Sequence, residues 1–365
     1  MDNENKRILV IQMSSMGDIV NTLPALYNIR KEYPTAYIAW LVRESFFEVL
    51  EKNPHIDEII VFPDILTKKF QRLNPNRNYN ILELRNILDF IRKIRNRKFD
   101  TTIDFHNITQ SGIIAFLSGA KKRIGFQRKK EKEFSQWFNN IKVRTDERNI
   151  HIVDQYLGLL SPLGINSREA IFDLGISKED NEYVENFFKG NYIKNDDLII
   201  GIHPGTTWER KKWKFENFIE LSNRLINSYD AKVILFWGDI EKDLIMEIKD
   251  INERIIIAPM TNFRQLAAFL KKCKIFISCD TGALHVASAV GTTTIGLFGP
   301  TDSKVTGPYR NGYVIKSPLK CSPCVLYWQK VSYEDIITKC PLDCMSYISI
   351  DDVLSTVKKI INRTN

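Results

Sequence analysis

Short apolar runs of β-strand character alternate with segments of helical periodicity along the chain. In the first half, "RILVIQM" (7–13), "AYIAWLV" (36–42) and "TTIDF" (101–105) are separated by helical patterns. A second series repeats this alternation through "LIIGIHPG" (198–205) and "KIFISCD" (274–280). Strands that are separated by helices are typical of parallel βαβ units. We therefore predict an α/β protein with two Rossmann-like, doubly wound parallel sheets.

A polar, turn-rich stretch around 191–197 separates the two series. With 365 residues the chain is long enough for two domains. We place the boundary near 185, which gives a first domain of 1–185, a second of 186–350 and a C-terminal segment of 351–365. In doubly wound sheets, ligands lie beyond the carboxyl ends of the strands, so the cleft between the domains is the expected site.

The charge balance favours an anionic partner. Lys and Arg number 52 against 44 Asp and Glu, which gives a net charge of +8. A nucleotide, a phosphorylated glycan, a nucleic acid or an acidic membrane face would each suit it. The chain contains no apolar run of membrane-spanning length, and its N-terminus is too polar for a secretory signal. We expect a cytoplasmic protein that can touch a membrane surface.

The first strand is followed by "SSMGD" (14–18) where a dinucleotide-binding enzyme would carry GxGxxG. The small residues Ser15 and Gly17 would let backbone N–H groups approach a ligand. Asp18 would then project into the site, where a carboxylate suits a general base. Asp18 is equally well explained as the cap of a helix that we expect to open near Asn21. The local sequence leaves both interpretations open.

Hydroxyl groups and cations follow the first strand of the second series, in "HPGTTWERKKW" (203–213). Such groups at the carboxyl end of a strand can neutralise a pyrophosphate. The alternative is a solvated basic turn. The position of these residues directly after a strand makes that alternative weaker. The residues concerned are Thr206, Thr207, Arg210, Lys211 and Lys212.

The segment "SCDTGALHVASAVG" (278–291) predicts a phosphate site. Asp280 ends a strand, Thr281 and Gly282 form the turn, and the N–H groups and dipole of the following helix favour an anion. His285, on the first turn of that helix, could donate to a phosphate oxygen. A lone histidine is more often a packed structural residue, but the adjacent helix terminus favours a role in binding.

Two features of the first half suggest contacts with an acceptor. Asp104 and His106, in "DFHN", stand at the mouth of the first sheet. The basic run 121–132, which includes Arg123, could meet an anionic acceptor. Charge runs are more often solvated faces, so this second interpretation has a plain alternative.

Four of the six cysteines cluster late in the chain as CxxC followed by CxxxC. In a reducing compartment this spacing suggests a structural tetrathiolate metal site, with zinc as the usual occupant. Reduced thiols packed in a loop are the alternative. The four residues are Cys321, Cys324, Cys340 and Cys344.

Taken together, "SSMGD", "HPGTTWERKKW", "RIGF" (123–126) and "CDTGALHVASAVGTTTIGLFGPTD" (279–302) resemble glycosyltransferase family 9, the ADP-heptose:lipopolysaccharide heptosyltransferases. The likeness extends from about residue 7 to 350, and the late cysteine pairs also look like those of many members. It implies a GT-B fold, two Rossmann-like domains facing a central cleft, with the acceptor on the N-terminal half. It also implies that the C-terminal helix crosses back to the first domain.

The resemblance further implies an inverting transfer of heptose from ADP-heptose to an inner-core sugar of lipopolysaccharide, with no cofactor required for catalysis and no nucleic-acid partner. Asp18 would be the base, and Thr207 and Lys211 would hold the diphosphate. Asp280, Thr281, Gly282 and His285 would complete the donor site. Met260 would lie near adenine, and Asp239 or Glu241 near the ribose.

Three rival functions share the predicted fold. A heptosyltransferase that modifies serines of a protein such as an autotransporter would differ in its acceptor, and its four-cysteine site could hold iron. A UDP-GlcNAc 2-epimerase would need no acceptor. A catalytically silent module would bind ADP-heptose without releasing ADP.

Overall fold

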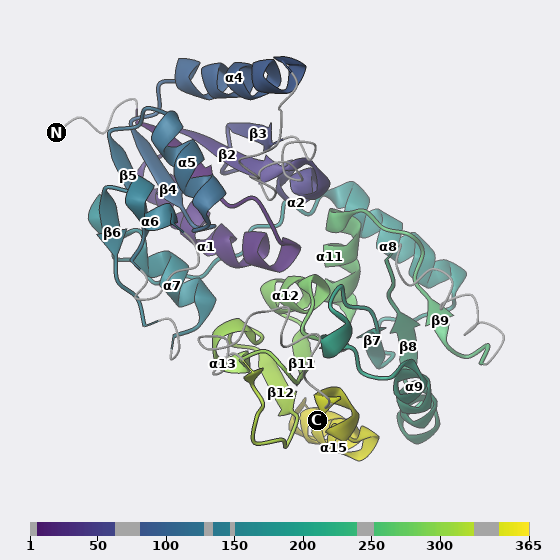
Figure 1. The fold of residues 1–365 in the computed structure, drawn as a ribbon. Coiled ribbons are helices and arrows are strands. Elements are labelled where there is room, and N and C mark those ends of the chain that lie inside the picture. The colour runs from purple at the N-terminus through teal and green to yellow at the C-terminus, as the bar shows by residue number, and fades with distance from the viewer. Residues whose placement is uncertain are drawn as a thin grey trace. The chain divides into compact units, whose positions relative to one another are not determined.

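The computed structural model describes residues 6–62, 81–127, 134–146, 150–238, 252–324 and 343–364. The chain divides into two units, residues 1–175 and 176–365, each built on one six-stranded sheet (Figure 1). All strand pairings in the described residues are parallel. The predicted pair of doubly wound sheets is confirmed. The division falls at 175, where the turn-rich stretch had suggested 185.

The sheet of unit 1 has the order β3-β2-β1-β4-β5-β6. Its central strand β1 pairs with β2 on one side and β4 on the other, and Ile8 to Ile11 are completely buried. Near-continuous apolar runs are what a parallel sheet covered on both faces requires. The strands are β1 (Arg7–Ile11), β2 (Tyr37–Arg43), β3 (Glu58–Phe62), β4 (Thr101–Asp104), β5 (Lys122–Phe126) and β6 (Ile141–Val143).

Helix α1 of unit 1 begins at Met16, well before the expected opening near Asn21. Ser15 has the extended backbone of an N-cap, so the segment interpreted as a loop is already the first turn of the helix. Helix α1 packs against α7, and α5 packs against α6. The helices of unit 1 are α1 (Met16–Glu32), α2 (Phe47–Leu50), α4 (Ile81–Asn96), α5 (Thr109–Leu117), α6 (Ser135–Phe138) and α7 (Ile152–Gly158).

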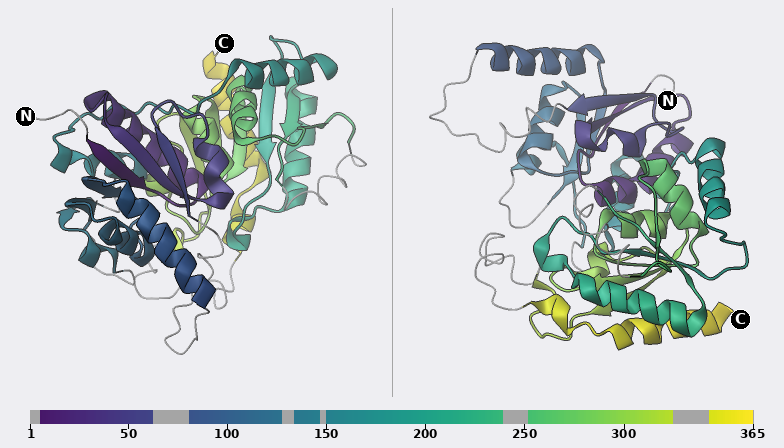
Figure 2. Two further views of the ribbon diagram at one scale, coloured as in Figure 1. Left: turned by 90° about the horizontal axis from the view of Figure 1, so that it is seen from above. Right: turned by 90° about the vertical axis from the view of Figure 1, so that its right-hand side faces the viewer.

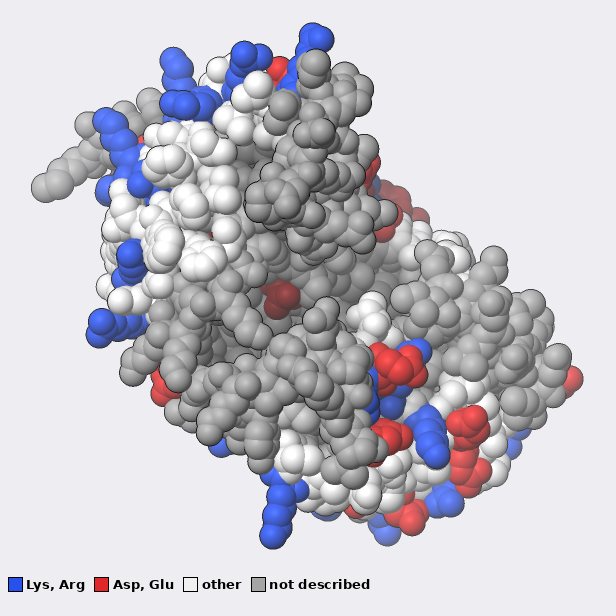
Figure 3. Space-filling model, viewed as in Figure 1, with Lys and Arg blue, Asp and Glu red and all other residues white. Residues whose placement is uncertain are grey.

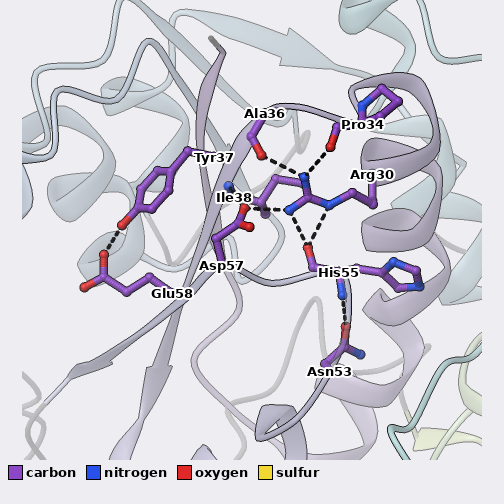
Figure 4. Close-up of polar contacts among 9 residues, drawn as sticks. All are labelled: Arg30, Pro34, Ala36, Tyr37, Ile38, Asn53, His55, Asp57 and Glu58. Atoms are coloured by element: carbon purple, nitrogen blue, oxygen red, sulfur yellow. Dashed lines mark hydrogen bonds and ion pairs between the residues drawn. The ribbon is translucent and has the colours of Figure 1, made fainter.

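Arg30 joins the C-terminal end of α1 to the edge of the sheet (Figure 4). Its guanidinium donates to the carbonyl oxygen of Ala36 at 2.7 Å and of His55 at 3.1 Å, and pairs with Asp57 at 2.6 Å. The same Asp57 oxygen accepts from the N–H of Ile38 at 2.7 Å. One partly buried cation therefore fixes α1 against both β2 and the loop before β3.

The sheet of unit 2 has the order β12-β11-β10-β7-β8-β9. Its strands are β7 (Ile199–His203), β8 (Lys232–Leu235), β9 (Ile256–Ile257), β10 (Ile275–Cys279), β11 (Thr293–Phe298) and β12 (Gly312–Lys316). Its helices are α8 (Lys178–Gly190), α9 (Phe215–Tyr229), α11 (Phe263–Lys272), α12 (Gly282–Ala289), α13 (Ser303–Thr306) and α15 (Ile350–Thr364).

Helix α15 packs within unit 2, beside α9 and β12 (Figure 2). Val353 and Val357 lie in the same buried cluster as Trp213, and Arg224 of α9 pairs with Asp351 at 2.8 Å. The resemblance had implied that this helix returns to the first domain. Within unit 2, its apolar side covers the sheet.

We expect Arg30→Met to lower the free energy of unfolding by about 2–3 kcal/mol, because Asp57 would lose its cation while carbonyl groups at the sheet edge lose their donor. The matched control is Arg92→Met, since Arg92 is an exposed residue of α4 whose ion pair with Asp89 should contribute little. Denaturant titration of both variants measures the difference. Equal effects would contradict the role assigned to Arg30.

Candidate functional site

The strand order reverses direction at one place in each sheet. In unit 1 the chain moves from β1 outward through β2 and β3 and then returns to place β4 on the other side of β1. In unit 2 the same reversal falls between β7 and β10. Crevices at the carboxyl ends of strands form at such switch points. The segments after β1, β4, β7 and β10 are therefore the places to look for chemistry.

The segment after β1 is held rigidly. Trp40 donates its indole N–H to the carbonyl oxygen of Gln12 at 3.0 Å, and the side-chain amide of Gln12 donates to the carbonyl oxygen of Ser14 at 2.9 Å. The N–H of Arg43 donates to the carbonyl oxygen of Met13 at 3.1 Å. Strand β2 thus fixes the turn from which α1 begins.

Asp18 stands at the third position of α1, and its carboxylate contacts the N-cap residue. The backbone N–H and the hydroxyl of Ser15 both donate to Oδ2, at 3.1 and 3.0 Å. This is the contact of a capping box. Gly17 is buried beside it, whereas Ser15 is exposed. Asp18 is thus not the N-cap of a helix that opens near Asn21, as the capping interpretation had it, but the N3 partner of the N-cap residue Ser15. This contact holds the carboxylate in one place at the switch point.

His106 follows β4, at the same switch point. The backbone N–H of His106 donates to the carbonyl oxygen of Ile11 at 3.1 Å, and its ring makes a hydrogen bond with the backbone of Ser14. Burial lowers the pKa of His106 to about 4, the positive charge of Arg43 lowers it as well, and the hydrogen bond with Ser14 opposes them. The ring is thus neutral at pH 7, and it can donate or accept a single hydrogen bond at each nitrogen.

Arg43 is a member of this group that the sequence analysis missed. It ends β2, next to β1, and its charge acts on His106. The available signal was a cation directly after the buried run "AYIAWLV". Its position at the carboxyl edge of the sheet makes it a candidate for contacts with an anionic acceptor.

Asp104 and Arg123, both predicted acceptor contacts, make hydrogen bonds within the scaffold of unit 1. Asp104 is completely buried and accepts from the N–H of Asn107 at 2.9 Å and the amide of Asn139 at 3.2 Å. Arg123 donates to the carbonyl oxygens of Phe138 and Ala120, both at 2.8 Å, near the start of β5.

In unit 2 an ion pair joins the segments after β7 and β10. The Nζ atom of Lys211 lies 2.6 Å from Oδ2 of Asp280, and Nε2 of His285 lies 3.7 Å from Oδ1. Burial alone would raise the pKa of Asp280, but the adjacent His285 ring and Lys211 ammonium hold it well below its usual range. Asp280 is therefore ionised at neutral pH, and its two oxygens hold the Lys211 ammonium and the His285 ring in place.

Further predicted donor residues belong to the same two segments as this ion pair, the one after β7 and the one after β10. Thr281 caps α12, accepting from the N–H of Leu284 at 3.4 Å, and Gly282 is the first residue of that helix. Thr206 is buried after β7, and Thr207 is exposed. The backbone N–H groups at the start of α12 thus directly follow Asp280 in the chain, and they can bind a phosphate.

Met260 lies two residues before the N-cap of α11, with its side chain 56% exposed. Its carbonyl oxygen accepts from the hydroxyl of Tyr183 at 3.3 Å. The segment after β9 is thus fixed and leaves the methionine side chain available for a ligand. The proposed ribose contacts, Asp239 and Glu241, lie outside the described residues.

The cysteine cluster gains no support from the described part of the chain. Cys321 and Cys324 are partly buried and Cys344 is buried, and Cys340 lies outside the described residues. Among the residues described, no group of three or more His, Cys, Asp or Glu side chains is arranged to hold a metal ion. The three described thiols are thus not gathered into a metal site as the spacing had suggested.

Comparison with known proteins agrees with this arrangement. The family model described as "Glycosyltransferase family 9 (heptosyltransferase)" matches residues 87–332, more than half of the chain. The chain belongs to glycosyltransferase family 9. It is therefore a glycosyltransferase, and the resemblance inferred from its motifs is confirmed. None of the helices in the described ranges has the length and apolar character needed to cross a bilayer.

Relatives of this family 9 chain match it over most of their length. The lipopolysaccharide core heptosyltransferase OpsX of Haemophilus influenzae is 24% identical over 315 residues, 84% of this chain and 82% of OpsX. A family 9 structure from Veillonella parvula has a TM-score of 0.77 at 23% identity, covering 100% and 99% of the two chains. Escherichia coli heptosyltransferase WaaC with ADP has a TM-score of 0.72 at 20% identity, covering 97% and 99%. These neighbours show the GT-B fold.

We expect His106 of this glycosyltransferase to titrate near pH 4 in an NMR titration of the imidazole signals, assigned with His106→Gln. Because its folded pKa lies below the unfolded value of about 6.5, the unfolded state binds the proton first. Its contribution to stability should be complete above about pH 6.5 and be lost as the pH falls toward 4. A midpoint at the ordinary value would contradict the described environment.

Asp280→Asn should lower the free energy of unfolding at pH 7 by about 2–4 kcal/mol, because Lys211 would lose its carboxylate in a partly buried place. The deficit should shrink below about pH 4, where the wild type loses the stabilisation of a depressed carboxyl pKa. Denaturant titrations at several pH values measure this. Asp196→Asn, at an exposed carboxylate, is the control. A deficit that is constant with pH would contradict an ionised Asp280.

Proposed function

We propose that this family 9 glycosyltransferase transfers heptose from ADP-heptose to an inner-core sugar of lipopolysaccharide, with inversion, in a single displacement. The ion pair Lys211–Asp280 beside the start of α12 is the observation that carries the donor half of this proposal. The names of the relatives supply the sugar and the acceptor class. Structures of WaaC with ADP and with ADP-2-deoxy-2-fluoro heptose support the choice of nucleotide.

Lys211 and the N–H groups of residues 281–283 would bind the diphosphate. Negative charge grows on the departing phosphate as the bond to C1 of the sugar breaks, so these groups stabilise the transition state more than the ground state. Asp280 would keep the ammonium of Lys211 in place through the 2.6 Å contact. Thr206, Thr207, His285 and Met260 would complete the donor contacts, with Glu241 at the ribose.

Asp18 would act as the general base. Its carboxylate would take the proton of the acceptor hydroxyl as that oxygen attacks C1, and ADP would leave from the opposite face, which inverts the configuration. The two contacts from Ser15 would hold the carboxylate in position for this transfer. Arg43 and the neutral His106 stand at the same switch point and would contact the acceptor.

The acceptor proposal also sets the place of action. Lipopolysaccharide precursors are anionic and sit at a membrane surface, and the net charge of +8 suits such a partner. We therefore propose that the enzyme works in the cytoplasm at the inner face of the inner membrane. It would require no cofactor for the displacement, since Lys211 and the helix N–H groups supply the charge.

The function is tested by measuring ADP release from ADP-heptose with and without a heptose-deficient lipopolysaccharide core. The proposal predicts release that depends on this acceptor. Turnover of UDP-GlcNAc alone would instead support an epimerase, and release only with a protein acceptor would support protein modification. Tight binding of ADP-heptose without release under any of these conditions would indicate a silent binding module, and each of these three outcomes would contradict the proposal.

The role of Asp18 is tested with Asp18→Asn, because an amide oxygen can still accept from the N–H of Ser15 but cannot take up a proton. We expect a loss of at least 100-fold in kcat with little change in the Kd for ADP, consistent with the loss of a general base. Ser15→Ala is the matched control: it removes the hydroxyl contact and should cost less than tenfold. Activity retained in Asp18→Asn would rule out the base role.

A further inference from the structure

An exposed group of aromatic side chains lies on unit 1, and it includes no residue placed in the reaction. Phe116 of α5 is 53% exposed, and Phe134 and Trp137, at and within α6, are 46% and 72% exposed. The rings of Phe134 and Trp137 lie 4.9 Å apart. We call Phe116, Phe134 and Trp137 the aromatic patch. Large apolar side chains that gather at a surface mark interaction sites more often than single ones do.

The aromatic patch is presented by a rigid backbone. The ring of Phe116 lies 6.1 Å from that of Phe138, which links α5 to α6, and the N–H of Phe134 donates to the hydroxyl of Thr109 at 2.9 Å. Gly112 lets the two helices approach so closely that an added Cβ would lie 2.8 Å from the Cα atom of Ser135. The patch is therefore fixed before any partner binds, which reduces the entropy cost of binding.

The described residues that flank the aromatic patch in the sequence are rich in cations and poor in carboxylates. The described residues of 105–146 contain five basic side chains, of which Lys121, Lys122, Lys142 and Arg144 are exposed, and one acidic side chain, Asp146. The fifth cation, Arg123, lies 5.4 Å from the ring of Phe116. Figure 3 shows Lys and Arg along the outer edge of this unit beside β5 and β6, with uncharged surface between them.

This combination suits an anionic lipid surface better than a second copy of the chain. Tryptophan and phenylalanine partition into the interface of a bilayer, and each nearby Lys or Arg adds attraction to anionic headgroups. Two copies that met through this surface would bring their own cations together, which is unfavourable. The patch also lies on the unit expected to bind the acceptor.

We propose that the aromatic patch and its surrounding cations dock the protein on an anionic bilayer. The inference goes beyond the proposed function and rests on it only in expecting a membrane-bound acceptor. Trp137 and Phe134 would enter the headgroup region, and Lys121, Lys122, Lys142 and Arg144 would face anionic lipid phosphates. Docking there would keep the enzyme on the surface that carries its acceptor.

The test is co-sedimentation of the full chain with vesicles of phosphatidylglycerol and phosphatidylcholine, compared with phosphatidylcholine alone. Wild type should bind the anionic vesicles at low salt and lose binding as salt rises. The double variant Phe134→Ser/Trp137→Ser should bind at least tenfold more weakly. Tyr192→Ser is the matched control, since Tyr192 is an aromatic residue of unit 2 that is 87% exposed, and it should bind like wild type.

A second readout separates docking from catalysis. The double variant should keep wild-type ADP release with a delipidated, water-soluble core acceptor, because no residue of the patch belongs to the proposed site. Failure of wild type to bind anionic vesicles, or equal binding by the double variant, would overturn the docking proposal. So would conversion of an oligomer to a monomer in the variant with unchanged vesicle binding. Vesicle binding without acceptor-dependent ADP release would retain docking and overturn only the proposed function.

Discussion

The reversal of strand order in each sheet is the constraint on which the rest of the structure depends. A parallel sheet buried on both faces exposes its polar loops only at its edges and ends, and the loops on either side of a reversal diverge and leave room for a ligand. In unit 1 this place is between β1 and β4, and in unit 2 it is between β7 and β10. The first reversal places Asp18, Arg43 and His106 at the carboxyl ends of neighbouring strands. The second does the same for Lys211 and Asp280.

The side chains at the two reversals suit different chemistry: those in unit 2 suit the binding of an anion, and those in unit 1 suit proton transfer to a carboxylate. In unit 2 the buried Asp280 is kept ionised by the His285 ring and the Lys211 ammonium, and it fixes that ammonium at the start of a helix, which suits a diphosphate. In unit 1 a carboxylate is held by the residue that caps its own helix, and a histidine that is neutral at pH 7 follows β4 at the same switch point. Capping and proton transfer are compatible tasks, because both require the carboxylate in one position.

Much of this arrangement could be predicted from the sequence. Buried parallel strands require long apolar runs, and the polar residues directly after these runs mark the carboxyl ends of the strands. "RILVIQM" and "KIFISCD" predicted β1 and β10 together with the residues that follow them. The short strand β6 and the partly exposed edge strand β12 carry no such run and were missed.

What could not be predicted concerns side chains whose partners are distant in the sequence. Asp104 and Arg123 stood beside a predicted site, but their hydrogen bonds to Asn139 and Phe138 depend on how α6 packs under β5. The start of α1 was placed too late because glycine and serine suggested a loop, while the contact between Ser15 and Asp18 begins the helix. The placement of α15 likewise follows from packing against α9 that local sequence does not encode.

The most direct test of the central claim is the anomeric configuration of the heptose in the product, determined by NMR after incubation of the enzyme with ADP-heptose and a heptose-deficient lipopolysaccharide core. A single displacement by an acceptor oxygen activated by Asp18 predicts that the configuration at C1 is the inverse of that in the donor. A product with retained configuration would contradict the account.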